Sequence, residues 1–191
     1  MLKIAVLVSG GGTNLQAVID AAKSGDIDAK VEVVIADRDC YGLERARLSG
    51  ISEYLVDRKL EKQNLFTQID DLIPSDCDLI ILAGFLSILD SKFIAKWQGR
   101  IINIHPSLLP KFGGSGMWGM NVHKAVVDAR ETKSGCTVHY VVDEIDGGDI
   151  ILQTEVPVLL NDTPEDVQKR VLSVEHSTMI AAIRKIQKII K

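Results

Sequence analysis

Asn103 and His105 are the residues whose types and spacing most clearly suggest chemistry. They interrupt the apolar run Ile101–Ile104, which predicts a buried strand. Because side chains alternate between the two faces of a strand, both polar side chains lie on one face. Pro106 has no N–H to donate to a neighbouring strand, so the strand ends here. An amide donor beside a titratable imidazole suits a reaction that passes through an oxyanion.

A glycine-rich loop, Gly10-Gly11-Gly12-Thr13-Asn14, joins the first predicted strand to the first predicted helix. Backbone N–H groups at a helix N-terminus attract anions, and glycines let a phosphate approach the backbone closely. The dinucleotide pattern fails because Leu15 occupies its third glycine position, and the Gly-Lys-Ser/Thr of phosphate-loop NTPases does not follow. The loop therefore favours a monophosphate ligand, with a simple tight turn as the alternative.

Three further polar residues are candidates with competing structural interpretations. Asp146 precedes two glycines, which is typical of a turn. His139 lies three residues after Cys136 on a predicted strand, so the two side chains point to opposite faces and no metal site is indicated. Glu175 lies on the last predicted helix, where a charged residue is normally part of a solvated face.

The elements that position these residues alternate between strand and helix over the first hundred residues. Strands are predicted over Ile4–Val8, Val31–Ala36, Ile51–Val56, Asp78–Ala83 and Ile101–Ile104. Helices are predicted over about Asn14–Lys23, Gly42–Ser49, Glu61–Leu72 and Asp90–Trp97. This order predicts an α/β fold with a doubly wound, mostly parallel open sheet and helices on both faces. Ligands of such sheets bind at the carboxyl ends of the strands, where Asn103 and His105 lie.

The pattern changes after Pro110. A glycine-rich loop over Lys111–Asn121 leads to a helix around Val122–Ala129, and two strands follow over Cys136–Val142 and Ile150–Val158. We expect these two strands to extend the sheet as antiparallel neighbours. The last helix begins at Thr163, with Asp166 in the capping-box position.

Composition bounds the class of protein. The chain has 191 residues, 46% of them hydrophobic, and a formal net charge of −4. We expect one domain over 1–191 with a substantial core, no membrane span, and no nucleic-acid surface. The start Met1–Val6 runs directly into a strand, which is not the pattern of a signal peptide. The odd number of cysteines predicts reduced thiols in the cytoplasm, and both a monomer and a homodimer remain open.

The segment Asn103–Pro110, Asn-x-His-Pro-Ser-Leu-Leu-Pro, resembles the signature of the folate-dependent formyltransferases. Further segments resemble the family in the same order: Ser9–Gln16, Leu82–Phe85, Thr137–His139, Asp143–Gly148 and Glu175–His176. Together they cover nearly the whole chain. The chain is most similar to the members that transfer a formyl group from 10-formyltetrahydrofolate to the amino group of glycinamide ribonucleotide in de novo purine synthesis.

The resemblance implies a role for each catalytic candidate. Asn103 and His105 would stabilise the oxyanion of a tetrahedral intermediate, and Asp146 would be the carboxylate partner of His105. A nearby negative charge favours the imidazolium and raises the pKa of a histidine. His139 would lie near the active site in support of Asp146. The co-substrate is 10-formyltetrahydrofolate, and no metal is implied.

The resemblance also implies binding residues for both small-molecule substrates. Gly12, Thr13 and Asn14 would hold the phosphate of the nucleotide, and Glu175 its ribose hydroxyls. Two segments would form the folate pocket, Phe85, Leu86, Ser87, Ile88 and Leu89 in the first and Val142, Asp143, Glu144 and Ile145 in the second. Residues of about 1–100 would then form the phosphate- and nucleotide-binding half, and about 101–191 the catalytic and folate-binding half.

The chain departs from the common family pattern at three places. Ser87 replaces a frequent arginine, Met179 replaces a frequent proline, and the loop Gly113–Gly119 is a longer variant whose Met117 and Trp118 suit a lid. The alternatives are a formyltetrahydrofolate hydrolase, a formyltransferase acting on methionyl-tRNA, or a catalytically silent nucleotide- or folate-binding module. The length argues against the hydrolase and the tRNA enzyme, which normally carry a further domain.

Overall fold

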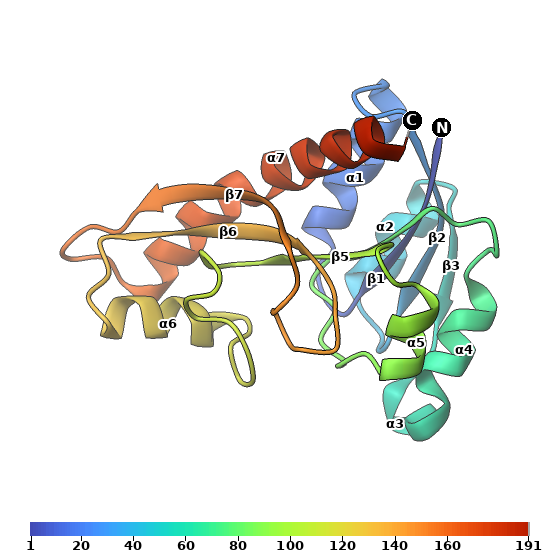
Figure 1. Cartoon of the computed structure of the whole chain (residues 1–191), viewed down its shortest axis with the longest axis horizontal. Coiled ribbons are helices and arrows are strands. Elements are labelled where there is room, and N and C mark those ends of the chain that lie inside the picture. Colours follow the sequence, from blue (N-terminus) through green and yellow to red (C-terminus); the bar gives the residue numbers. More distant parts are fainter. Residues whose placement is uncertain (191) are drawn as a thin grey trace.

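One seven-stranded sheet organises residues 1–190, the part of the chain that the computed structural model describes (Figure 1). The strands are β1 (Leu2–Val8), β2 (Ala29–Ala36), β3 (Ser52–Leu55), β4 (Leu79–Leu82), β5 (Ile101–His105), β6 (Lys133–Tyr140) and β7 (Ile150–Pro157). They lie in the order β3-β2-β1-β4-β5-β6-β7. All neighbours from β3 to β5 are parallel, and β6 and β7 add antiparallel pairs. The predicted fold class is confirmed.

Helices cover both faces of the sheet. They are α1 (Thr13–Ser24), α2 (Tyr41–Leu48), α3 (Arg58–Glu61), α4 (Leu65–Leu72), α5 (Ser91–Lys96), α6 (Met120–Asp128) and α7 (Pro164–Ile190). Residues of α1, α2, α6 and α7 share one hydrophobic cluster, whereas α4 and α5 contribute to the other. In Figure 1, α7 runs from beside β6 and β7 toward α1.

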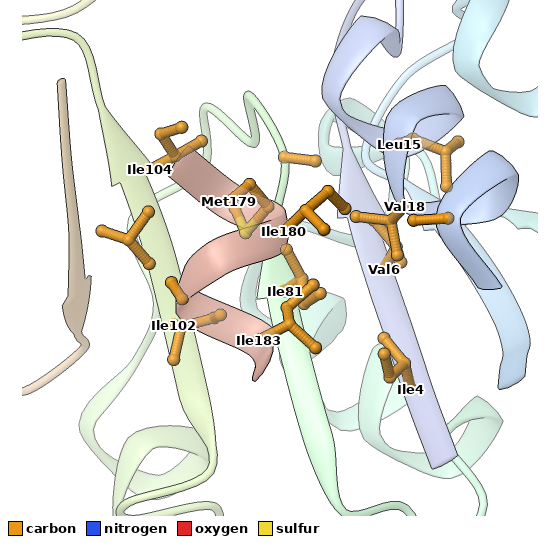
Figure 2. Close-up of a cluster of buried hydrophobic side chains, with 14 of the residues drawn as sticks. Ile4, Val6, Leu15, Val18, Ile81, Ile102, Ile104, Met179, Ile180 and Ile183 are labelled. Atoms are coloured by element: carbon orange, nitrogen blue, oxygen red, sulfur yellow. The ribbon is translucent and has the colours of Figure 1, made fainter. Parts of the chain in front are cut away.

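The alternation of side chains along the strands explains the two clusters. On β4, Ile81 faces the α1/α7 side and Ile80 the α4/α5 side. Figure 2 shows Ile81 and Ile102 beside Met179 and Ile183 of α7. Met179 is fully buried there and is part of the core. Each such buried aliphatic side chain contributes about 1.5–3 kcal/mol to stability.

The predicted helix over Glu61–Leu72 is confirmed only over α4, because the chain before Leu65 forms α3 and a short 3₁₀ turn (Lys62–Asn64) instead. No residue of α3 or of the 3₁₀ turn is buried, so no apolar stripe holds them in register with α4. Lys62 adopts a positive φ of 43° and interrupts the helix. The apolar face begins only at Leu65, where α4 starts.

The last helix begins as predicted. The Asp166 N–H donates to Thr163 Oγ1 at 3.2 Å, and the Thr163 N–H donates to Asp166 Oδ2 at 3.0 Å. These reciprocal bonds form a capping box at the start of α7. Within residues 1–190, none of the helices has the length and apolar character needed to cross a bilayer.

Candidate active site

Asn103 and His105 lie on the predicted face of β5. Ile102 and Ile104 point into the α1/α7 cluster, which leaves the two polar side chains on the opposite face. The antiparallel register pairs Asn103 with His139 of β6. Directly opposed residues project to the same side of a sheet, and Asn103 Nδ2 lies 3.1 Å from His139 Nε2.

The partners of His139 define its tautomer. Its Nδ1 lies 2.9 Å from the carbonyl oxygen of Tyr140, which can only accept, so Nδ1 carries the proton. The same ring's Nε2 faces both the Asn103 amide nitrogen at 3.1 Å and Asp146 Oδ1 at 3.6 Å. The contact with His139 fixes the orientation of the Asn103 amide and leaves its second N–H available to a ligand.

His105 lies between a backbone carbonyl and a carboxylate. Its Nε2 donates to Phe112 O at 2.8 Å, and its Nδ1 is 3.5 Å from Asp146 Oδ2. Burial lowers the pKa of His105 and outweighs the opposing effects of Asp146 and Phe112 O. Asp146 thus acts to raise the pKa of His105 as expected, but the net pKa lies below its ordinary value because desolvation of the ring is the larger effect.

Asp146 is held as a carboxylate at the centre of the group. Its Oδ2 accepts the Gly114 N–H at 2.9 Å, and its Oδ1 lies 3.6 Å from His139 Nε2. Burial acts to raise the pKa of Asp146, but His139, His105 and the Gly114 N–H together bring it below its usual value. Asp146 has a φ of +56° in its turn, a conformation that aspartate tolerates better than most residues. Asp146 is therefore both a turn residue and a neighbour of His105, so the two interpretations of this residue do not exclude each other.

These groups open into a cavity of about 720 Å³ at the carboxyl edge of the sheet. Asn103, His105, His139 and Asp146 all line it. Eight of the nine residues predicted for folate also line it: Phe85, Leu86, Ser87, Ile88, Leu89, Val142, Asp143 and Ile145. Glu144 does not line it; its side chain is exposed and its carboxyl group lies beside Gly147.

The Ser87 hydroxyl binds a buried carboxylate. It donates to Asp37 Oδ2 at 2.6 Å, and Arg38 binds the same carboxylate through two nitrogens. Burial acts to raise the pKa of Asp37, but the Arg38 and Ser87 donors bring it below its ordinary value. Arg38 and Arg58 line this end of the cavity, and neither was identified from sequence because both lie in unremarkable polar segments.

The predicted nucleotide residues are only partly brought together. Asn14 Nδ2 donates to Glu175 Oε2 at 2.8 Å, and both residues line the cavity. Glu175 is therefore half-buried between α7 and α1 rather than part of a solvated face. Gly12 caps α1 with a φ of +70° and Thr13 is exposed, and both lie outside the cavity lining on the adjoining loop.

A buried network behind the site was missed from sequence. The Thr137 hydroxyl donates to Ser107 O at 2.6 Å and accepts the Leu109 N–H at 3.1 Å. Gln153 Nε2 donates to Leu109 O, and the Ser107 hydroxyl donates to Lys111 O. These bonds fix the segment that carries the Phe112 carbonyl to His105. Thr137 and Gln153 are polar residues on predicted strands, which gives no indication of such a network.

Within residues 1–190, no three His, Cys, Asp or Glu side chains are grouped so as to hold a metal ion. The arrangement is instead one of hydrogen-bond donors and proton-transfer groups. A free amide N–H, a neutral imidazole and a carboxylate meet at one wall of the cavity. Such a set can stabilise an oxyanion and move a proton.

Comparisons with known proteins agree with this geometry. Residues 2–183 match the family model described as formyl transferase. The chain is 44% identical over 182 residues to the phosphoribosylglycinamide formyltransferase of Haemophilus influenzae, covering 92% of this chain and 82% of that protein. It is 40% identical to the trifunctional purine biosynthetic protein adenosine-3 of Homo sapiens over 95% of this chain, but spans 18% of that protein. The structure of glycinamide ribonucleotide transformylase 1 from Symbiobacterium toebii matches with a TM-score of 0.89 and 40% identity, covering 96% of this chain and 86% of that one. The chain belongs to the formyl transferase family.

Proposed function

We propose that the chain transfers the formyl group of 10-formyltetrahydrofolate to the amino group of glycinamide ribonucleotide. One observation carries the proposal: Asn103, His105 and Asp146 line the same cavity as Asn14 and Glu175. A transferase needs its reactive groups and both substrate sites in one continuous space. The relatives whose names describe this activity support the same conclusion over most of the chain.

The substrate amine is the nucleophile, so the enzyme needs no serine or cysteine nucleophile. The amine attacks the formyl carbon, and the carbonyl oxygen becomes the oxyanion of a tetrahedral intermediate. The free N–H of Asn103 donates to this oxygen. The amine loses a proton as it attacks, and N10 of the folate gains one as the bond to the formyl carbon breaks.

His105 is suited to hold that proton in transit. The resting ring is neutral because burial lowers its pKa, so Nδ1 is available as a base. A proton taken up at Nδ1 would lie between the ring and Asp146 Oδ2, whose separation is 3.5 Å. The imidazolium is thus stabilised by the carboxylate while the intermediate carries negative charge.

The two substrates approach this centre from opposite sides. The nucleotide occupies the side of Asn14 and Glu175, where a carboxylate accepts hydrogen bonds from ribose hydroxyls and the Gly10–Thr13 loop receives the phosphate. The folate occupies the side of Phe85–Leu89 and Val142–Ile145, and Trp118 is exposed at its edge. Holding both in one cavity supplies rate through proximity.

The division of the chain follows from these sites. Residues of about 1–100 supply the nucleotide loop, and about 101–191 supply the catalytic groups and one wall of the folate pocket. Phe85–Leu89 belongs to the first half, so the folate pocket draws on both. The three cysteines have free thiols, which supports a reducing cytoplasm as the site of action.

The test mixes purified protein with glycinamide ribonucleotide and 10-formyltetrahydrofolate and follows the folate product by absorbance. The control omits the nucleotide. Product that forms only with the nucleotide supports the proposal, and a formylated nucleotide by mass spectrometry identifies the acceptor. Product without the nucleotide would indicate a hydrolase instead. Folded protein that binds either substrate without turnover would indicate a binding module, and turnover only with methionyl-tRNA would identify another acceptor.

A further inference from the structure

We propose that Arg45 is a positioning residue that orients the phosphate loop Gly10–Thr13 toward the nucleotide phosphate. The inference rests on the proposed function, because it assigns that loop the phosphate of glycinamide ribonucleotide. Arg45 lies on α2, behind the loop and outside the lining of the cavity. It therefore acts on the substrate through the backbone of the loop.

Three contacts fix the Arg45 guanidinium, and the first of them is with the loop itself. Its Nε donates to Gly11 O at 2.7 Å, and its Nη1 donates to Gln16 Oε1 at 3.3 Å in the first turns of α1. Its Cζ lies 5.0 Å from the centroid of the Tyr41 ring, within the range of a cation–π contact. Arg45 thus links α2, the loop and α1 through one planar group.

These bonds determine where the loop N–H groups point. Gly10 O accepts the Gly42 N–H at 3.0 Å, so the carbonyls of Gly10 and Gly11 both face α2. In a planar trans peptide the N–H points away from the C=O. The N–H groups of Gly11 and Gly12 therefore point away from α2, and neither has an acceptor among residues 1–190. Successive N–H groups that face one way form an anion-binding concavity.

The loop packs so tightly against α2 that it has little room to adopt another conformation. A Cβ added to Gly12 would lie 2.9 Å from Gly42 Cα and 3.3 Å from Arg45 Cδ, so the loop backbone already packs against α2 and the Arg45 side chain. A Cβ added to Gly42 would likewise lie close to Gly10 O. Arg45 has no carboxylate partner among the described residues, so its charge adds to the positive potential of the loop.

Arg47 provides a matched control on the same helix. It pairs with Glu44 and Glu53, which ties α2 to β3 and makes no contact with the loop. The experiment compares Arg45→Gln, Arg45→Lys and Arg47→Gln with the parent chain. Each is assayed with glycinamide ribonucleotide and with the corresponding riboside, which lacks the phosphate.

We expect Arg45→Gln to raise the KM for the nucleotide roughly tenfold, since a hydrogen bond from a charged donor is worth at least that factor. Its kcat and its KM for the folate should change less than twofold, and its kcat/KM for the riboside should be that of the parent. Arg45→Lys keeps the positive charge but loses the planar guanidinium that donates to Gly11 and Gln16 together. It should raise the nucleotide KM by about threefold. Arg47→Gln should behave as the parent with both acceptors.

An unchanged nucleotide KM in both Arg45 variants would overturn the inference. Equal losses with nucleotide and riboside would also overturn it, because they would indicate general damage to the fold. Absence of turnover in the parent chain would instead contradict the proposed function. In that case calorimetric Kd values for the nucleotide and the riboside, measured on the same variants, still decide the role of Arg45.

Discussion

Replacing Asp146 with asparagine removes a charge while keeping the shape of the side chain. The amide oxygen can still accept the Gly114 N–H that now reaches Asp146 Oδ2 at 2.9 Å. The side chain is 11% exposed, so it has little freedom to find other partners. What Asp146→Asn chiefly removes is the negative charge that faces His105.

The size of the effect follows from the distance between the two groups. At an effective dielectric constant of about 20, a carboxylate and an imidazolium 3.5 Å apart attract each other by about 5 kcal/mol. Incomplete charge development in the transition state and partial solvent screening reduce this to about 3–4 kcal/mol, which corresponds to a loss of about 10²–10³ in kcat. Because the resting imidazole is neutral, we expect the KM of either substrate to change little.

The pH profile separates this mechanism from simple disruption. In the parent chain, kcat/KM should fall with acid at a pH below 6.5, because burial lowers the pKa of the neutral His105 that accepts the proton. Asp146 opposes that shift, so its loss should lower the pKa of His105 further and move the acid limb to lower pH. Both proteins use the same substrates, so ionisation of the substrate amine cancels in the comparison.

The assay is steady-state formyl transfer from pH 5 to 8 with Asp146→Asn, and Asp143→Asn as control. Asp143 lines the same cavity on the same turn but forms no ion pair with either histidine. Because Asp143 belongs to the folate side of the cavity, its replacement can change the KM of the folate, but it should leave kcat at saturation and the acid limb unchanged. A loss of kcat below tenfold in Asp146→Asn, with the acid limb unmoved, would refute the reasoning.

Three further replacements test other parts of the structure. Asn103→Ala should lower kcat by about 10²–10³ with little change in KM, as is typical when a single oxyanion donor is lost. Single-turnover rates near those of the parent would contradict that role. Glu175→Gln should raise the nucleotide KM by about tenfold through loss of a charged acceptor, whereas an unchanged KM would exclude a ribose contact. Thr163→Ala removes the α7 cap and should lower the free energy of unfolding by about 1 kcal/mol and the Tm by about 2–4 °C, without loss of kcat. An unchanged Tm would show that the capping box does not contribute to stability.

The fold was predictable because its signals are local. Apolar runs and their flanking glycines marked the strands, and the alternation along β5 correctly separated Ile102 and Ile104 from Asn103 and His105. The start of the helix predicted over Glu61–Leu72 was wrong because helix-forming composition continues across a segment, before Leu65, that buries nothing. Propensity alone does not reveal where a helix loses its packing surface.

The electrostatic state of the site was not predictable from residue types. A histidine near an aspartate suggests a raised pKa, yet His105 has a lowered one because its burial is the larger effect. Burial depends on the segment around Phe112, whose carbonyl reaches His105 and whose φ is +55°. That conformation is held by side chains more than twenty residues away, such as Thr137 and Gln153. Such distant constraints leave no local pattern in the sequence.

The change from parallel to antiparallel strands explains why the catalytic groups meet at this edge of the sheet. Asn103 and His139 are 36 positions apart, and only the β5–β6 register places them opposite each other. A slip of one residue would send His139 to the α7 face, where Val138 now packs. At this same position β7 contains an extra residue, since Val138 pairs with Leu152 while His139 pairs with Ile150. Such a bulge increases local twist and redirects the strands beyond it, here toward the turn that carries Asp146 to both imidazoles. The bulge in β7 therefore helps to place Asp146 beside His105 and His139.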